Sequence, residues 1–404
     1  MKNKNINVLE LFAGVGGFRI GLEKANKQVF KTLWANQWEP SKKAQDAFTC
    51  YSNHFPKSTN LNEDISTISD DRFKEMNADM IVGGFPCQDY SVARSLSGGM
   101  GIQGKKGVLF WEIMRATEVI KPKFLLLENV DRLLKSPVAQ RGRDFAIMLS
   151  AFNKLGYSVE WRVINAAEYG QAQRRRRVFI FAYRNDITFA DQFKSFTDEE
   201  LIYQSGIFAK EFPIENEPYK KRHVEGTLSN DIVEVSESFS SSVFNTGIMR
   251  NGKFTSIDTI AISETPTTLG EILQPAETVD EKYYLNETEI EKFTYLRGAK
   301  KIERTAASGH KYIFSEGGMS ETDDLQKPGR TMLTSEGSKN RSTHLIKVDD
   351  RYRILTPIEC EALNGFPANW TDSMSERMRY FCMGNALVTG IIERIGKQIV
   401  KLNE

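Results

Sequence analysis

Short apolar runs and longer helical stripes alternate along the first 185 residues of the chain. The runs have the length of buried strands, and most of them end in glycine or in a polar residue. Between them, apolar residues recur every three or four positions, as on one face of a helix. This alternation predicts an α/β fold with an open sheet. Strands are expected at 8–12, 32–35, 80–82, 124–127, 159–163 and 178–182, and helical stripes at 20–25, 108–120 and 145–152.

The alternation stops near Asn185. Residues 191–240 are rich in acids and serine, with only short mixed apolar runs, which predicts a second, smaller and mostly irregular domain with short strands. Near the C-terminus, apolar positions again recur at helical spacing. The expected division is a first domain of residues 1–185 plus 384–404, closed by a helix containing Ile391, Ile392, Ile395 and Ile399, and a second domain of residues 186–383.

Three turns that follow strands indicate a nucleotide-like cofactor. Ala13–Phe18 is a glycine-rich turn from strand into helix, which lets backbone N–H groups approach a ligand closely. The second turn, 36–39, lies where a doubly wound fold commonly has its acidic ribose contact, and the third is 63–65. Together they predict an adenosine-bearing cofactor, with Trp38 and Ile65 as walls for its ring. Ordinary core packing is the alternative for Trp38.

Cys87 is the candidate nucleophile. The strand Met80–Val82 is followed by Gly-Gly-Phe-Pro-Cys-Gln, so Cys87 is expected on a loop at the edge of the sheet where α/β proteins bind ligands. Pro86 fixes its own φ angle and restricts Phe85 to an extended conformation, which holds the cysteine stiffly. A small buried cysteine is the usual alternative for an isolated thiol.

Two further features belong to the same edge. Glu128 ends a fully apolar strand, where a carboxylate is costly to bury without a partner or a task, so it is a candidate acid beside Cys87. The glycine-rich segment 88–107 carries three basic residues, including Arg94, against one acid. It has the composition of a lid over an anionic substrate, although an ordinary surface loop has the same composition.

Composition narrows the class of protein. The 404 residues have a formal net charge of +1, so a nucleic-acid surface must be local, as in the basic runs 174–177 and 297–311. The four cysteines and four histidines are scattered, which argues against a disulfide scaffold or a zinc site and fits a reducing cytosol. Neither a signal peptide nor a membrane segment is recognisable, so a cytoplasmic location is expected.

Five sequence blocks occur in the order typical of one enzyme family. In these blocks the chain resembles a bacterial or phage cytosine-5 DNA methyltransferase of the restriction–modification type, over nearly its whole length. The resemblance implies a doubly wound S-adenosylmethionine-dependent methyltransferase sheet, closed by the C-terminal helix, and a smaller target-recognition domain. The blocks are Phe12–Phe18, Gly84–Gln88, Glu128–Val130, the Gln-x-Arg-x-Arg of Gln173, Arg175 and Arg177, and Gly384–Asn385.

The resemblance also assigns roles by position. Cys87 would be the nucleophile and Glu128 the acid beside the cytosine, while Arg175 and Arg177 would contact the base and brace the cysteine loop. DNA contacts would come from Gln88, Arg94 and Gln173, and no metal is implied. The cofactor S-adenosylmethionine would be bound by Phe12, Gly14, Val15, Gly17, Gln37, Trp38, Asp64, Ile65, Pro86, Leu109, Asn385 and Leu387.

One position departs from the family pattern. The family usually has an acid just before the tryptophan, which holds the ribose hydroxyls, whereas this chain has Gln37 there and Glu39 just after Trp38. An amide still hydrogen-bonds a hydroxyl, but without charge assistance its hold is weaker. Either Gln37 holds the ribose or Glu39 has taken over that role.

The chemistry explains these residue types. Carbon 5 of cytosine becomes nucleophilic only after a thiolate adds to carbon 6. A thiol of pKa about 8.5 therefore needs a positive neighbour such as Arg177. Glu128 can relieve the negative charge that develops on the ring only if it is protonated, and burial favours that form. In a duplex the base must also flip out of the stack, at a few kcal/mol.

The expected partner is double-stranded DNA, bound by a monomer that needs no membrane and no stable protein partner. Two alternatives remain at this level. A catalytically idle DNA-binding protein, such as a repressor, could keep the fold, although the complete set of Cys87, Glu128 and arginines argues against it. A methyltransferase of the same family that acts on tRNA is the other, and the long segment 186–345 favours a DNA reader instead.

Overall fold

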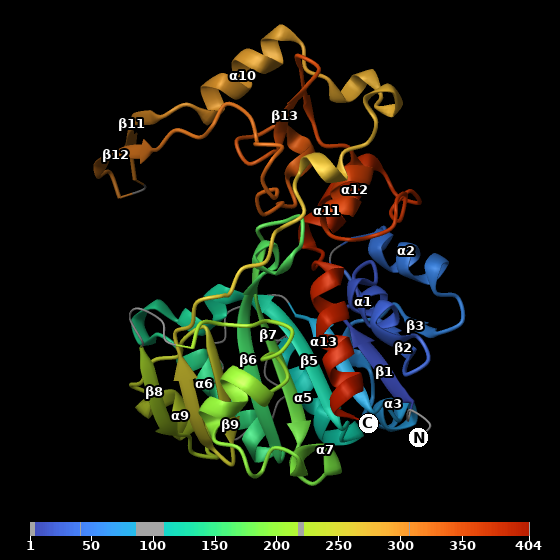
Figure 1. Cartoon of the computed structure of the whole chain (residues 1–404), viewed down its shortest axis with the longest axis vertical. Coiled ribbons are helices and arrows are strands. Elements are labelled where there is room, and N and C mark those ends of the chain that lie inside the picture. Colours follow the sequence, from blue (N-terminus) through green and yellow to red (C-terminus); the bar gives the residue numbers. More distant parts are fainter. Residues whose placement is uncertain (1–4, 41, 86–108, 217–221, 307, 404) are drawn as a thin grey trace.

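The computed structural model describes residues 5–40, 42–85, 109–216, 222–306 and 308–403. Figure 1 shows two lobes. The larger lobe is built around a long twisted sheet, and a smaller lobe of short helices and hairpins stands above one edge of that sheet. Among the described residues, no helix is both long and apolar enough to cross a membrane, and no three potential metal ligands cluster.

The large lobe is organised by one sheet of ten strands. Its strands are β1 (Ile6–Leu11), β2 (Phe30–Asn36), β3 (Thr59–Leu61), β4 (Met80–Gly84), β5 (Phe124–Val130), β6 (Tyr157–Asn165), β7 (Arg176–Arg184), β8 (His223–Thr227), β9 (Thr246–Arg250) and β10 (Lys253–Ile257). They are ordered β3-β2-β1-β4-β5-β7-β6-β9-β10-β8. The first five in this order are parallel, and each later strand is antiparallel to its neighbour. The expected α/β class and each expected strand are therefore present.

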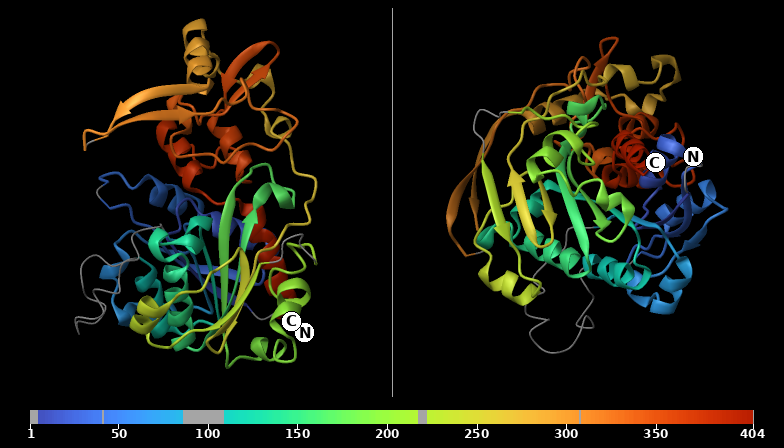
Figure 2. Two further views of the ribbon diagram at one scale, coloured as in Figure 1. Left: turned by 90° about the vertical axis from the view of Figure 1, so that its left-hand side faces the viewer. Right: turned by 60° about the horizontal axis from the view of Figure 1, so that its bottom comes forward.

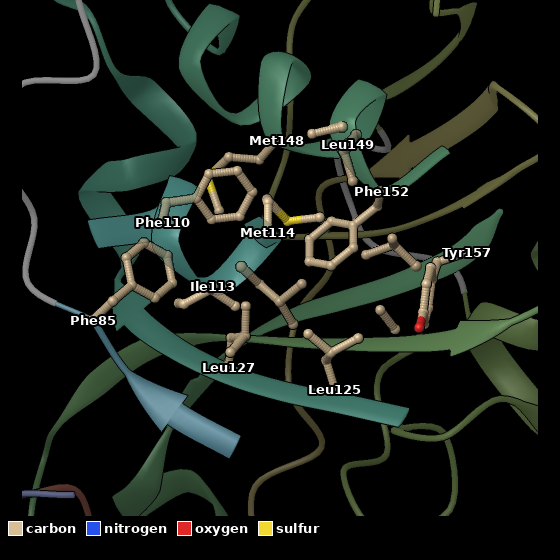
Figure 3. Packing of buried hydrophobic residues seen from close by; sticks show 14 of the residues in the cluster. Phe85, Phe110, Ile113, Met114, Leu125, Leu127, Met148, Leu149, Phe152 and Tyr157 are labelled. Carbon is tan, nitrogen blue, oxygen red and sulfur yellow. The ribbon is translucent and has the colours of Figure 1, made fainter. Parts of the chain in front are cut away.

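Helices cover both faces of the sheet. One face carries α3 (Asp70–Met76), α5 (Leu109–Ile120), α6 (Arg143–Lys154) and α9 (Ile232–Ser238), and the other carries α1 (Gly17–Asn26), α7 (Thr188–Asp191) and α13 (Thr389–Leu402). Strand β5 is buried on both faces, which explains its uninterrupted apolar run. Figure 3 shows the first of these layers, where Phe110 and Ile113 of α5 pack between Leu127 of β5 and Met148 of α6.

Residues beyond 185 extend the sheet, which differs from the expected division of the chain. Strand β9 pairs with β6, and β10 and β8 continue the same sheet outward. The indole N–H of Trp161 donates to the carbonyl of Phe244 at 3.1 Å, and a side chain at Gly247 would collide with that indole. The expected boundary at residue 185 thus falls inside the sheet lobe, because long-range pairing recruits strands too short to stand out in the sequence.

Two charged residues of β6 are buried where this strand contacts the segment that follows β7. Glu160 accepts a hydrogen bond from the backbone N–H of Ile207 at 3.0 Å, and the Arg162 guanidinium donates to the carbonyl of Phe212 at 2.6 Å. Burial raises the pKa of Glu160 to about 7 and lowers that of Arg162 to about 10. The segment that follows β7 is therefore fixed to the sheet through backbone carbonyls and N–H groups. It contains α8 (Asp198–Glu200) and the π-helical turn η5 (Leu201–Ser205).

The smaller lobe consists of short elements. They are α10 (Glu287–Arg297), β11 (Lys300–Thr305), β12 (Lys311–Glu316), β13 (Leu345–Val348), β14 (Arg351–Ile354), α11 (Pro357–Leu363) and α12 (Glu376–Asn385). The hairpins β11–β12 and β13–β14 are separate two-stranded sheets. A third apolar cluster joins the lobes, in which Phe366 and Met383 pack with Val15, Ile20 and Cys50 near α1 and α2 (Asp46–His54).

Candidate active site

The site lies where β4 and β5 end side by side. Their parallel register pairs Gly84 directly with Glu128, so the carboxyl group stands beside the backbone that leads to Cys87. A Cβ atom at Gly84 would lie 3.0 Å from Oε2 of Glu128. Glycine at this position leaves room for the acid, which gives Gly84 a steric role beyond its place in a turn.

Glu128 forms an ion pair with one of the predicted arginines. Oε1 of Glu128 lies 2.9 Å from Nε of Arg177, and the two side chains are only 13% and 18% exposed. Burial raises the pKa of Glu128, and the charges of Arg177 and Arg175 oppose that rise. The structure therefore brings a mostly buried acid and a cation together at the end of β5.

Both ends of the segment that carries Cys87 are held together. Phe85 and Phe110 are buried, and their ring centroids are 5.9 Å apart (Figure 3). The side-chain amide of Asn129 donates to the carbonyl of Phe85 at 2.9 Å. Because Phe85 and Phe110 flank 86–108, the chain enters and leaves that segment at one place beside Glu128. Pro86, Cys87, Gln88, Arg94 and the expected lid at 88–107 lie outside the described residues.

Arg175 and Gln173 face the junction between the lobes. Arg175 is 3% exposed and donates to the carbonyls of Met332 and Gly384, at 3.2 and 2.9 Å. Its burial lowers its pKa to about 9. Gln173 is fully buried, donates to Oδ1 of Asn364 at 2.9 Å and accepts from the N–H of Met332 at 3.0 Å. The burial of Gln173 argues against the predicted DNA contact, because both ends of its amide already hold the smaller lobe.

The predicted cofactor residues follow the carboxyl ends of β1, β2 and β3. At β1 the chain turns with positive φ angles at Phe12 and Gly14, and a Cβ atom at Gly14 would meet nothing within 4 Å. Oε1 of Gln37, after β2, accepts a hydrogen bond from the N–H of Gly14 at 2.8 Å. Gln37 therefore stands directly beside the open side of the glycine turn.

Glu39 has other partners. Its carboxylate accepts from Nζ of Lys42 at 2.8 Å, and its backbone N–H and carbonyl bind the side chain of Gln45. This arrangement favours Gln37 over Glu39 as the residue near the cofactor.

The other predicted cofactor residues divide into two groups. Trp38 and Asn385 are exposed, whereas Asp64 is partly exposed and caps a short 3₁₀ turn by accepting from the N–H of Ser66. Val15, Gly17, Ile65 and Leu387 are buried, and Leu109 is partly buried against the core. A Cβ at Gly17 would lie 3.1 Å from Leu387, so this glycine permits packing of the last helix.

The open side of Gly14, the amide of Gln37, exposed Trp38 and Asp64 are together compatible with an adenosine-bearing cofactor. Backbone N–H groups of a positive-φ turn suit an anionic or polar group, and an indole face suits an adenine ring. The residues present therefore fit the cofactor that the sequence predicts.

Sequence reasoning missed two residues that support the site. Asn129 fixes Phe85, and its only sequence signal is its place directly after Glu128. The indole N–H of Trp370 donates to the carbonyl of Val15 at 2.8 Å, and its ring stacks on His54 with centroids 3.6 Å apart. Trp370 thereby braces the glycine turn from the smaller lobe, and a separation of 355 positions leaves no local signal.

The remaining cysteines are unsuitable as nucleophiles. Cys50, Cys360 and Cys382 are buried and free. Burial raises the pKa of Cys50 and of Cys382 to about 12, and that of Cys360 well above its usual range.

Comparisons with known proteins agree with this geometry. A family model described as C-5 cytosine-specific DNA methylase matches residues 6–401. The type II methyltransferase M.Sau3AI of Staphylococcus aureus is 59% identical over 98% of this chain and 96% of its own length. The type II methyltransferase M.Bsp6I of a Bacillus species is 24% identical over 98% of this chain and 99% of its own length. Among solved structures, the Dnmt2 methyltransferase of S. pombe has a TM-score of 0.60 at 15% identity, covering 98% of both chains, a likeness of fold.

Proposed function

The chain belongs to the family of C-5 cytosine-specific DNA methylases, and from this premise we propose its reaction and substrate. It methylates carbon 5 of a specific cytosine in double-stranded DNA, with S-adenosylmethionine as methyl donor. In the cell this methylation protects DNA from a cognate restriction endonuclease. The observation that carries the proposal is the mostly buried ion pair between Glu128 and Arg177. This pair lies beside Gly84, and Gly84 precedes Cys87 by three residues.

The proposed reaction begins with the thiolate of Cys87. Its sulfur forms a bond to carbon 6 of the cytosine. The electron pair of the 5,6 double bond then forms a 4,5 double bond, and the pair of the 3,4 double bond moves onto ring nitrogen 3. Burial raises the pKa of Glu128, which favours the protonated form that would donate a hydrogen bond at ring nitrogen 3 and stabilise this charge. Arg177 lies against the carboxyl group, orients it, and supplies positive charge near the thiolate.

The remaining steps restore the enzyme. S-adenosylmethionine would supply an electrophilic methyl group to carbon 5, and its sulfur would keep the electron pair of the broken S–CH3 bond, leaving S-adenosylhomocysteine. Carbon 5 then loses its hydrogen as a proton to a base, and the resulting electron pair expels the sulfur of Cys87 from carbon 6. Gly14, Gln37, Trp38 and Asp64 would hold the cofactor, with Asn385 at the rim.

Access to carbon 6 requires the cytosine to leave the duplex. We propose that the base flips into the space beside Glu128, with residues 88–107 closing over it. Sequence recognition belongs to the smaller lobe, within the segment up to about residue 345. The β11–β12 hairpin is the leading candidate because Tyr312 and Ile313 are exposed on a ribbon that carries basic side chains.

A mechanism-based substrate tests the proposal. Fluorine at carbon 5 of the target cytosine cannot leave as a cation, so the enzyme should stall with Cys87 still bonded to carbon 6. We expect duplex DNA with 5-fluorocytosine at the target to give a denaturant-resistant adduct that requires S-adenosylmethionine. Mass spectrometry should place it on the peptide that contains Cys87.

Two controls accompany this experiment. Cys87→Ser should form no adduct and should still bind DNA and cofactor, because a hydroxyl is far less ionised than a thiol near neutral pH. An adduct on Cys50, Cys360 or Cys382 would refute the assignment. Failure to form an adduct on a confirmed target sequence would refute the covalent mechanism.

A further inference from the structure

A hollow of about 220 Å³ lies at the edge of the sheet lobe that faces the smaller lobe. Its lining does not include Glu128, and it is formed where the sheet extension meets the turn after β5. Segments far apart in the sequence contribute to its wall. The lining residues used below are Asp131, Lys135, Arg141, Arg176, Arg222 and Asp258.

The hollow has an excess of positive charge. Two of its four cations are paired with acids, Arg176 with Asp131 at 3.1 Å and Arg222 with Asp258. Lys135 and Arg141 are exposed and form no ion pair with any described residue. Ser242 and the amide of Asn245 add polar groups to the wall. Uncompensated cations around a concave polar surface suit an anion the size of a phosphate.

The hollow adjoins the proposed active site. Asp131 is three residues beyond Glu128, and the guanidinium of Arg177 donates to the carbonyl of Arg176 at 2.7 Å. Successive side chains of β7 alternate between faces, so Arg177 turns toward Glu128 while Arg176 turns toward the side of α6. One strand therefore presents neighbouring arginines to the acid and to the hollow.

The smaller lobe overhangs this side of the sheet. Figures 1 and 2 show the β11–β12 ribbon extending outward from the smaller lobe, over the end of the sheet lobe. The ribbon and its flanks carry Lys301, Arg304 and Lys311 as well as the exposed Tyr312 and Ile313. A duplex that contacts both lobes would meet the basic ribbon of the smaller lobe and the hollow of the sheet lobe.

We propose that the hollow binds a backbone phosphate of the DNA duplex next to the flipped cytosine, through Lys135 and Arg141 with Arg176 and Arg222. The inference rests on the proposed function in taking DNA as the ligand and in placing the flipped cytosine beside Glu128. A phosphate contact carries no sequence information, so this site positions the duplex while the smaller lobe reads it. Binding the phosphate releases condensed counterions, which makes the contribution of this site depend on salt.

The test is the double variant Lys135→Ala/Arg141→Ala, because neither residue belongs to the proposed catalytic or cofactor site. The matched control is Lys154→Ala/Lys253→Ala, which removes the same charge. Lys154 and Lys253 lie at the ends of α6 and β10 that point away from the hollow. Fluorescence anisotropy at several KCl concentrations should compare a target duplex with a scrambled duplex. Methyl transfer should be measured at saturating target DNA.

We expect Lys135→Ala/Arg141→Ala to lower the affinity of the enzyme for both duplexes by the same factor, about tenfold at moderate salt. The slope of log affinity against log salt should fall by about one, as for loss of one phosphate contact, while the control keeps the wild-type slope. The rate at saturating DNA should stay near wild type.

An unchanged salt slope in Lys135→Ala/Arg141→Ala would overturn the phosphate site. A loss of affinity confined to the target duplex would mean that these residues read bases instead. A wild-type enzyme that binds DNA without methylating it would refute the proposed function, yet leave the anisotropy test intact. The two failures are therefore distinguishable.

Discussion

The two lobes handle buried charge in opposite ways. In the sheet lobe, large apolar clusters cover both faces of the sheet, and buried carboxyl groups such as Glu10 and Glu160 have pKa values raised to about 7 by burial. In the smaller lobe, the apolar cluster around Phe293 is small, and Asp323 is held by Arg297 and Arg330, which bring its pKa well below the usual range.

The difference follows from the length of the elements. Long strands and helices bury enough apolar surface to tolerate a protonated acid, whereas short hairpins and turns do not. The smaller lobe instead fixes its irregular segments with directional pairs such as Arg353–Glu359, whose side chains are both 0% exposed and 2.7 Å apart. The sheet lobe tolerates isolated buried acids within its apolar packing, whereas the smaller lobe adds fully buried charge pairs to its apolar clusters.

The largest expected effect concerns activity in the sheet lobe. Glu128→Gln keeps the shape of the site but removes the acid, so the methyl-transfer rate should fall by about 10²- to 10⁴-fold. Cofactor affinity should stay near wild type, and the fold should persist because the amide oxygen of glutamine can still accept a hydrogen bond from Arg177. Single-turnover kinetics and calorimetry check this, with exposed Glu118→Gln on α5 as control. A defect confined to cofactor binding would place Glu128 in the wrong site.

The next effect concerns stability in the smaller lobe. Arg353→Met leaves the carboxylate of Glu359 buried without its cation, which should lower the free energy of unfolding by about 3–5 kcal/mol. Arg351→Met on the same strand breaks the exposed pair with Glu281 and should change stability little. Chemical denaturation measures both variants. Equal effects would mean that burial of the pair does not matter, and the contrast between the lobes would fail.

Stability should respond to pH with opposite sign in the two lobes. Glu160 holds a proton in the folded state up to a pKa of about 7, whereas the unfolded chain loses it near 4.5, so its contribution falls as pH rises through this window. As the pH rises from 4.5 to 8, the free energy of unfolding of Glu160→Gln should therefore increase relative to that of wild type by up to about 3 kcal/mol.

Asp323 has the reverse dependence. Its pKa is lowered by the arginines around it, so its contribution is present at neutral pH and is lost as pH falls through the lowered value. The difference between wild type and Asp323→Asn should be largest near pH 7 and shrink in acid. Thermal unfolding of Glu160→Gln and Asp323→Asn across pH measures how each stability difference from wild type depends on pH. The same direction of change in both variants would contradict the contrast between the lobes.

The smallest effect concerns the cofactor. Gln37→Glu should tighten S-adenosylmethionine several-fold, because a carboxylate adds charge assistance to a hydrogen bond with a ribose hydroxyl. Glu39→Ala should change affinity little, since its carboxylate is turned toward Lys42. Calorimetry on the two variants decides between the residues. Unchanged affinity in Gln37→Glu together with a loss in Glu39→Ala would transfer the ribose contact to Glu39.

The sequence by itself determined the features that depend on local pattern. Apolar runs ending in glycine or in a polar residue identified β1, β4 and β5, and the order of the blocks identified the family. It also predicted that Glu128 stands beside the segment that leads to Cys87, because strand ends in a parallel sheet meet at one edge. These signals are local, since periodicity and turn chemistry act within a few residues.

Only the tertiary structure decided which distant segments meet. It joined β9 to β6 and so extended the sheet past residue 185, and it buried Gln173 between the lobes where an exposed DNA contact was expected. It also brought Trp370 to the carbonyl of Val15 and Asn129 to the carbonyl of Phe85. Such contacts depend on strand register and on the packing of remote elements, which composition and periodicity do not encode.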